Sequence, residues 1–166
     1  NGDVIKDSIA GNLCRCTGYQ PIIKAAKSLR TKKRIDHFHK NRKKTIAQLK
    51  KIGNESIIIY RKDKKYFAPR YVAELKKILK KNINSQLLSG GTDLSLSVTK
   101  ERKDINSIIY INSIKELNYI KNNKEFIEVG AATPLTKFEL YIKKYYPDFN
   151  KILKRYGSVQ IRNVAT

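Results

Sequence analysis

Apolar residues recur at two spacings along this chain, and each spacing predicts a different kind of element. Spacings of three and four residues predict amphipathic helices over residues 3–11, 21–29, 45–52, 72–79, 135–145 and 149–156. Short β-branched and aromatic runs predict strands over residues 56–60, 86–88, 107–111 and 125–129, with a hairpin turn at 62–65. A short helix capped by Ser113, with Glu116 three residues on, is expected after the third strand. Because strands alternate with helices beyond residue 56, we expect an α/β layer there.

The strand predicted at residues 86–88 leads into the most distinctive loop of the chain, Ser-Gly-Gly-Thr-Asp at residues 89–93. Two glycines without Cβ atoms let the backbone turn tightly and bring its N–H groups against an anion, and Ser89 and Thr92 add hydroxyl donors. A nucleotide pyrophosphate is the anion that such a loop suits best. The spacing matches neither the Rossmann glycine fingerprint nor a P-loop, so plain turn chemistry is the alternative.

The formal charge of +22, from 36 Lys and Arg against 14 Asp and Glu, suggests a nucleic-acid or anionic-membrane partner. The lysines, however, are spread over nearly every segment together with Ile and Asn, which indicates compositional bias, and we expect no nucleic-acid partner. The densest basic block, residues 30–44, has few apolar residues and is expected to be a solvated linker, with a nucleic-acid arm as the alternative. His37 and His39 lie in this block without a third ligand nearby, so we expect exposed linker residues there.

The composition favours a soluble chain with a real core, since 40% of the residues are hydrophobic. The longest uninterrupted aliphatic run, residues 57–59, is far too short for a membrane span, and no signal-peptide pattern is present at the start. We therefore expect a cytoplasmic protein without membrane association. The chain begins at Asn1 and contains no Met, which predicts a fragment.

A second candidate site is the loop between the first two predicted helices, which carries Cys14 and Cys16. Cysteines one residue apart reach a common centre only from a curled loop, which Gly11 and Gly18 permit. A disulfide closing so small a ring would be strained, zinc usually takes cysteines spaced more widely, and an iron–sulfur cluster needs four ligands where this chain supplies two. Two buried structural thiols are the remaining alternative, against which the adjacent Arg15 argues because it favours the thiolate.

Residues 11–22, Gly-Asn-Leu-Cys-Arg-Cys-Thr-Gly-Tyr-Gln-Pro-Ile, resemble the end of the helical iron–sulfur domain of the molybdenum hydroxylases, the family of xanthine dehydrogenase, aldehyde oxidase and carbon monoxide dehydrogenase. In that family a Cys-x-x-Cys pair and a later Cys-Arg-Cys pair together hold a [2Fe-2S] cluster. The resemblance implies that Cys14 and Cys16 are the latter pair of metal ligands. The upstream pair is not in this sequence.

Two further segments resemble the FAD-binding domain of the same family, as found in the small subunit of bacterial xanthine dehydrogenases. They are YFAPRYVAELKKIL followed by QLLSGGTDLSLSVTK, and YGSVQIRNVAT at residues 156–166. The resemblance implies that the Gly-Gly loop wraps the FAD pyrophosphate, that Tyr156 lies beside the isoalloxazine, and that Asp93 accepts ribose or backbone donors. For Tyr156 alone, packing at a helix end is the alternative. The expected cofactor-binding residues are Gln86, Leu87, Leu88, Ser89, Gly90, Gly91, Thr92, Asp93, Tyr156 and Thr166.

The resemblance also implies an α+β fold in three parts. Residues 1–29 would be the C-terminal part of the helical [2Fe-2S]-binding domain, residues 30–55 a basic linker, and residues 56–166 the N-terminal α/β lobe of an FAD-binding domain of the carbon monoxide dehydrogenase flavoprotein type.

The function implied by the resemblance is electron transfer within a xanthine dehydrogenase-like enzyme that hydroxylates purines. Electrons would pass from a molybdopterin centre on a molybdenum-binding large subunit through [2Fe-2S] clusters to FAD and on to NAD, and no catalytic residue for the hydroxylation is expected in this chain. Oxygen or a quinone is the alternative acceptor. A different class of protein, a basic nucleic-acid-binding module with a structural metal at Cys14 and Cys16, is the alternative function.

Overall fold

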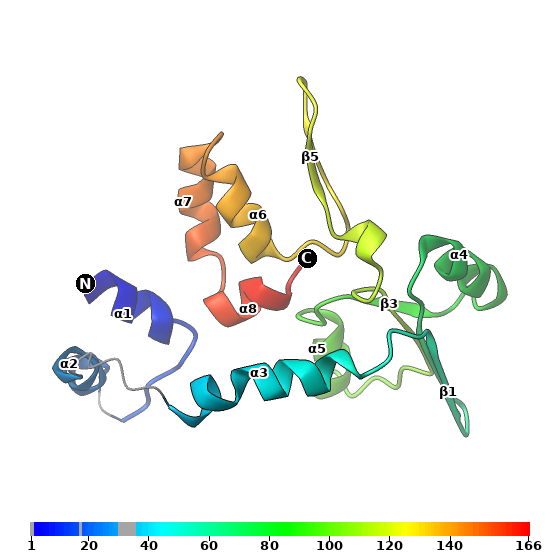
Figure 1. Cartoon of the computed structure of the whole chain (residues 1–166), viewed down its shortest axis with the longest axis horizontal. Coiled ribbons are helices and arrows are strands. Elements are labelled where there is room, and N and C mark those ends of the chain that lie inside the picture. The colour runs from blue at the N-terminus through cyan, green and yellow to red at the C-terminus, as the bar shows by residue number, and fades with distance from the viewer. Residues whose placement is uncertain (1, 17, 30–35) are drawn as a thin grey trace. The chain divides into compact units, whose positions relative to one another are not determined.

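A computed structural model describes residues 2–16, 18–29 and 36–166, and the chain divides into two compact units, Asn1–Asn54 and Glu55–Thr166 (Figure 1). The first unit contains α1 (Gly2–Ile9), α2 (Gln20–Ser28) and α3 (His37–Lys50). The second contains the strands and the remaining helices. Part of the predicted linker, residues 30–35, lies outside the described residues.

Helices α1 and α2 contact each other and hold the cysteine loop between them. Pro21 occupies the first turn of α2, as the sequence predicts, because its missing N–H has no partner to lose at that position. Ile23 is the buried residue of α2, with 9% of its surface exposed. The other predicted apolar positions of these two helices are partly or fully exposed, among them Val4 at 62% and Ile22 at 43%.

Helix α3 begins eight residues before the helix predicted at residues 45–52, so part of the segment predicted as a linker is helical. The start is set by Asp36, whose carboxylate accepts a hydrogen bond of 2.8 Å from the His39 N–H and caps the helix. The same hydrogen bond lowers the pKa of Asp36. No described residue of α3 is buried, which agrees with the basic, apolar-poor composition of the segment.

The second unit has a mixed α/β organisation, which confirms the predicted fold class. Its elements are β1 (Ile57–Arg61), β2 (Lys64–Ala68), α4 (Val72–Lys81), β3 (Gln86–Leu88), α5 (Leu94–Thr99), β4 (Ser107–Tyr110), the 3₁₀ helix η1 (Lys115–Leu117), β5 (Ile120–Asn122), β6 (Ile127–Val129), α6 (Leu135–Ile142), α7 (Pro147–Arg155) and α8 (Val159–Val164).

A four-stranded sheet in the order β1-β2-β4-β3 organises this unit. Strands β1 and β2 form an antiparallel hairpin, whose turn places Lys62 at φ 52°, whereas β4 runs parallel to both β2 and β3. The apolar stripe of α4 packs on the sheet together with the turn after β4. The resulting core consists of Phe67, Leu75, Ile109, Ile111 and Ile114, with Val72, Ile78, Leu79 and Leu117 packed around it. Because β3 and β4 are parallel neighbours, the loops after them lie at the same edge of the sheet.

The segment after β4 differs from the predicted capping box. Residues 115–117 form a single 3₁₀ turn whose preceding residue is Ile114, and Ser113 does not cap it. The Glu116 carboxylate instead accepts a hydrogen bond of 2.7 Å from the Val72 N–H, at the first turn of α4. The Glu116 carboxylate, which the local spacing predicts as a cap of its own helix, therefore makes a long-range hydrogen bond to α4 instead.

The C-terminal part of the second unit comprises the β5–β6 hairpin and the helices α6, α7 and α8, with α6 in contact with both other helices (Figure 1). Strand β5 and the short helices α5 and α8 were not predicted. In the described part of the chain, no helix is long and apolar enough to cross a membrane.

Candidate cofactor sites

The loop predicted to bind a pyrophosphate follows β3 and borders a cavity of about 310 Å³. The residues that line this loop cavity are Gln86, Leu87, Ser89, Gly90, Gly91, Thr92, Asp93, Leu94 and Thr166. Among the residues predicted to bind the cofactor, Leu88 and Tyr156 do not line it. Thr166, predicted from a segment far along the chain, does line it, so the fold brings both predicted flavin segments to one cavity.

The backbone of the loop presents unpaired donors beside this cavity. Within residues 2–16, 18–29 and 36–166, no protein acceptor pairs with the backbone N–H groups of residues 90–93. Backbone N–H groups without a protein acceptor beside a cavity can donate hydrogen bonds to the oxygens of a phosphate. The loop therefore fits the pyrophosphate of a dinucleotide cofactor.

The two glycines of the loop serve different purposes. Gly91 has φ +72°, in the left-handed region that glycine adopts without strain, and this conformation produces the turn. Gly90 is instead required by close packing within the protein. A Cβ added there would lie 1.7 Å from the Val164 carbonyl oxygen and 2.9 Å from the Ala165 nitrogen. The end of α8 is thus seated directly against the loop.

Three hydrogen bonds hold the end of α8 in this position. The Thr166 hydroxyl donates to Ser89 Oγ at 2.8 Å, and the Leu135 N–H donates to the Ala165 carbonyl oxygen at 2.8 Å. The Thr136 hydroxyl donates to Asn163 Oδ1, also at 2.8 Å. These contacts connect the loop cavity to α6 through the last residues of the described chain.

A buried ion pair fixes α8 from its other side. Arg162 Nε lies 3.0 Å from Glu139 Oε2 of α6, and the two side chains are 8% and 14% exposed. Arg162 Nη1 also donates to the Tyr156 carbonyl oxygen at 2.9 Å. The sequence analysis did not identify Arg162, because its importance comes from burial and from a partner 23 residues away.

Asn112 is a further residue of this site that sequence reasoning missed. It lies two residues after the end of β4, whereas Ser89 directly follows β3, and its Oδ1 accepts a hydrogen bond of 2.5 Å from the Ser89 hydroxyl. The signal that could have found it is its position, since polar residues shortly after neighbouring parallel strands meet at one edge of a sheet. The Ser89 hydroxyl proton is therefore engaged with Asn112, and among the predicted hydroxyl donors the loop keeps Thr92.

Tyr156 and Asp93 occupy positions that the sequence did not anticipate in detail. Tyr156 ends α7, is 57% exposed and does not line the loop cavity. Asp93 does line it, but its side chain makes no capping hydrogen bond to the α5 backbone. The Asp93 carboxylate therefore does not accept a hydrogen bond from a backbone N–H of α5.

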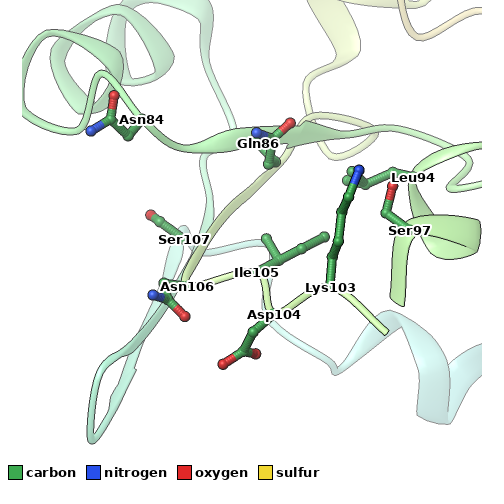
Figure 2. Close-up of a pocket in the computed structure, with 9 residues that line it drawn as sticks. All are labelled: Asn84, Gln86, Leu94, Ser97, Lys103, Asp104, Ile105, Asn106 and Ser107. Carbon is green, nitrogen blue, oxygen red and sulfur yellow. The ribbon is translucent and has the colours of Figure 1, made fainter. Parts of the chain in front are cut away.

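A second cavity, of about 640 Å³, lies at the opposite, amino ends of β3 and β4 (Figure 2). It shares Gln86 and Leu94 with the loop cavity. Figure 2 shows the Lys103 side chain extending between Gln86 and Ser97, and its Nζ forms an ion pair of 2.8 Å with Glu101. Asp104 accepts a hydrogen bond from Lys64, so the charges of this cavity are largely paired within the protein.

The cysteine loop lies between α1 and α2, with Cys14 half-buried and Cys16 exposed. The Cys14 N–H donates to the Tyr19 hydroxyl at 3.1 Å, and Gly11, Gly18 and Tyr19 all have positive φ, which curls the loop. No group of three or more His, Cys, Asp or Glu side chains suited to a metal occurs among the described residues. The two thiols of this loop would be half of the four ligands that an iron–sulfur cluster needs.

Sequence comparisons match this chain to two domain families. The sequence model of the FAD binding domain in molybdopterin dehydrogenase matches residues 60–166, and that of the [2Fe-2S] binding domain matches residues 1–27. The nicotinate dehydrogenase FAD-subunit of Eubacterium barkeri is 32% identical over 63% of this chain and 37% of its own length. Aldehyde oxidase 4 of Arabidopsis thaliana is 31% identical over 78% of this chain and 12% of its own length. Xanthine dehydrogenase of Emericella nidulans is 23% identical, over 98% of this chain and 16% of its own length.

Solved structures show the same fold. Carbon monoxide dehydrogenase from Hydrogenophaga pseudoflava superposes with a TM-score of 0.56 and 24% identity, over 65% of this chain and 39% of that chain. Quinoline 2-oxidoreductase from Pseudomonas putida 86 gives a TM-score of 0.56 and 20% identity, over 61% of this chain and 36% of that chain. This chain thus spans well under half the length of the relatives that it matches.

The fold and the two cofactor loops define the class of protein, an FAD-binding domain preceded by part of a [2Fe-2S] domain. The chain belongs to the family of the FAD binding domain in molybdopterin dehydrogenase. FAD and a [2Fe-2S] cluster are accordingly the cofactors of these two segments.

Proposed function

We propose that the loop after β3 binds the FAD pyrophosphate and that Cys14 and Cys16 are two ligands of a [2Fe-2S] cluster. The observation that carries the first part is the set of four backbone N–H groups, residues 90–93, which lie beside a cavity and have no acceptor in the part of the chain that the structure describes. When bound, FAD and the cluster supply the redox chemistry, and the protein supplies binding and orientation. The Thr92 hydroxyl adds a donor to the same cavity, and the ribose is the partner that we propose for Asp93. We place Tyr156 beside the isoalloxazine in the full-length subunit.

The organisation that we propose for the chain has residues 1–29 as the end of the cluster domain and residues 56–166 as the start of the flavin domain, joined by the basic residues 30–55. The separation of the chain into the units Asn1–Asn54 and Glu55–Thr166 supports this division. The electrons would come from a substrate hydroxylated at a molybdopterin centre on a molybdenum-binding partner subunit. The Eubacterium barkeri relative is an FAD-subunit, which supports a multi-subunit arrangement.

For the whole enzyme we propose a purine such as xanthine as the substrate and NAD as the acceptor. In the purified complex, xanthine is expected to bleach the flavin absorption, and NAD is expected to restore it. Nicotinate in place of xanthine, and oxygen or a quinone in place of NAD, are the comparison reactions. Bleaching by nicotinate but not by xanthine would overturn the substrate assignment, and reoxidation by oxygen or quinone alone would overturn the acceptor assignment.

Replacing Gly91 with valine in the full-length protein is expected to abolish FAD retention while leaving iron content and helical content unchanged. A β-branched residue is strained at φ +72°, so the turn that aims the N–H groups of residues 90–93 cannot be kept. Flavin and iron per protein, measured after desalting, check this result.

Two matched variants complete the experiment. Val98→Ala changes an exposed residue of α5 outside the loop cavity and should leave both cofactors in place. Cys16→Ser should show the converse result, loss of iron with flavin retained, because the cysteine loop lies in the other unit. Wild-type flavin content in the Gly91→Val protein would contradict the assignment of the loop.

A further inference from the structure

The strongest unexplained feature of the site is a directed chain of hydrogen bonds that passes through Ser89. The Thr166 hydroxyl donates to Ser89 Oγ at 2.8 Å, and the Ser89 hydroxyl donates to Asn112 Oδ1 at 2.5 Å. A serine hydroxyl has a single proton, and an amide oxygen can only accept, so the order of donors along the chain is fixed. The hydrogen bond to Asn112 thereby fixes the rotation of the Ser89 hydroxyl. One lone pair of Ser89 Oγ accepts the Thr166 proton, and one is left.

We propose that Asn112 is a positioning residue for FAD binding, which acts through Ser89 on the loop of residues 90–93. This inference rests on the proposed binding of the FAD pyrophosphate by that loop. Asn112 does not line the loop cavity, so we do not place it in contact with the cofactor. Its role is to hold the first residue of the loop before the cofactor arrives.

Asn112 is suited to this role because its backbone is anchored on both sides. Its neighbour Ile111 is 7% exposed and donates its N–H to the Leu88 carbonyl oxygen at 2.9 Å. Ile114 is fully buried in the core and donates to the Ile111 carbonyl oxygen at 3.0 Å. The amide side chain thus projects from a rigid turn of the sheet toward a loop that is less constrained.

The end of the loop has its own anchor, because the Gly91 carbonyl oxygen accepts hydrogen bonds from the Ser95 N–H at 3.1 Å and from the Ser95 hydroxyl. The backbone N–H groups of residues 90–93 have no protein acceptor within the described residues. At the start of the loop, the hydrogen bond from Ser89 to Asn112 is a side-chain tie to the segment after β4, beside the close approach of α8 at Gly90. A loop held in its binding conformation loses less conformational freedom on binding, which increases affinity.

The test is a double-mutant cycle on FAD affinity in the full-length protein, with Asn112→Leu, Ser89→Ala and the double variant. One hydrogen bond contributes about 1 kcal/mol net, so Asn112→Leu is expected to raise the FAD Kd roughly fivefold to tenfold. If Asn112 acts through Ser89, Asn112→Leu has no further effect once Ser89 is alanine. The Kd is measured by titrating deflavinated protein with FAD, and thermal melting is followed in parallel.

Asn118→Leu is the matched control, because Asn118 Oδ1 also accepts a side-chain hydrogen bond, from Lys137 Nζ at 2.7 Å, but outside the loop cavity. It should leave the FAD Kd within twofold of wild type. The role of Asn112 would be overturned by an unchanged Kd in Asn112→Leu. It would also be overturned if the fold-changes in Kd of Asn112→Leu and Ser89→Ala simply multiply in the double variant. Either result would leave the proposed FAD site standing. Failure of the wild-type protein to bind FAD would overturn the proposed function and this inference with it.

Discussion

Alanine in place of Gly90 is expected to destabilise the unit Glu55–Thr166 by about 3 kcal/mol or more and to abolish FAD retention. The added Cβ would lie 1.7 Å from the Val164 carbonyl oxygen, so either the loop or the end of α8 has to move by more than an ångström. Both carry residues that line the loop cavity, and neither movement preserves it. Urea unfolding of the chain and flavin content of the full-length protein measure the two effects.

The matched control for this prediction is Gly2→Ala in α1. A Cβ at Gly2 would meet only the end of the flexible Lys27 side chain, at 3.7 Å, and alanine favours a helix by about 1 kcal/mol over glycine. Neither the flavin content nor the free energy of unfolding of the second unit should fall. Wild-type stability in Gly90→Ala would show that α8 does not rest against the loop as described.

Substituting Arg162 with methionine is expected to cost the second unit about 3 to 5 kcal/mol, because it leaves the Glu139 carboxylate in a buried position without its cation. The Tyr156 carbonyl oxygen loses its donor in the same variant. Urea unfolding of the chain is followed by far-ultraviolet circular dichroism. The expected result is loss of a cooperative transition or a large fall in its midpoint.

The double variant Arg162→Met/Glu139→Met should recover most of this loss, since replacing both partners of a buried pair by apolar residues is often neutral or stabilising. Lys151→Met serves as the surface control. Its ion pair with Asp148 spans 2.8 Å, but the side chains are 76% and 91% exposed, so its removal should cost less than about 1 kcal/mol. A double variant as unstable as Arg162→Met would indicate that the arginine acts by packing and not by charge.

The sequence predicted much of the local structure correctly, and the cases share a physical basis. Strand β3 has the predicted bounds, and α4 begins at the predicted Val72, because each combines a clear apolar period with strong turn signals at its ends. The curled cysteine loop follows from glycines and a proline that act within a few residues. The two cofactors, FAD and a [2Fe-2S] cluster, were implied by the resemblance of longer segments around Cys-Arg-Cys and Ser-Gly-Gly-Thr-Asp to a known family, since the short motifs alone left alternatives open.

The errors have two causes. Glu116 has the spacing of a capping-box acid, but its carboxylate accepts the N–H of Val72, 44 residues earlier in the chain. Helix α3 starts early because Asp36 supplies a local cap that the apolar pattern does not reveal.

By itself, the sequence determined which two loops are the candidates for binding cofactors, because backbone turns, thiols and hydroxyl donors are properties of residues adjacent in the chain. Only the tertiary structure decided how the loop at residues 89–93 is held. Gly90 is needed for the approach of Val164, Ser89 is bonded to Asn112 and Thr166, and Arg162 is paired with Glu139, all between residues far apart in sequence. Such contacts depend on which strands become neighbours and which helix ends meet them, and the free energy that selects those pairings comes from burial of the whole core.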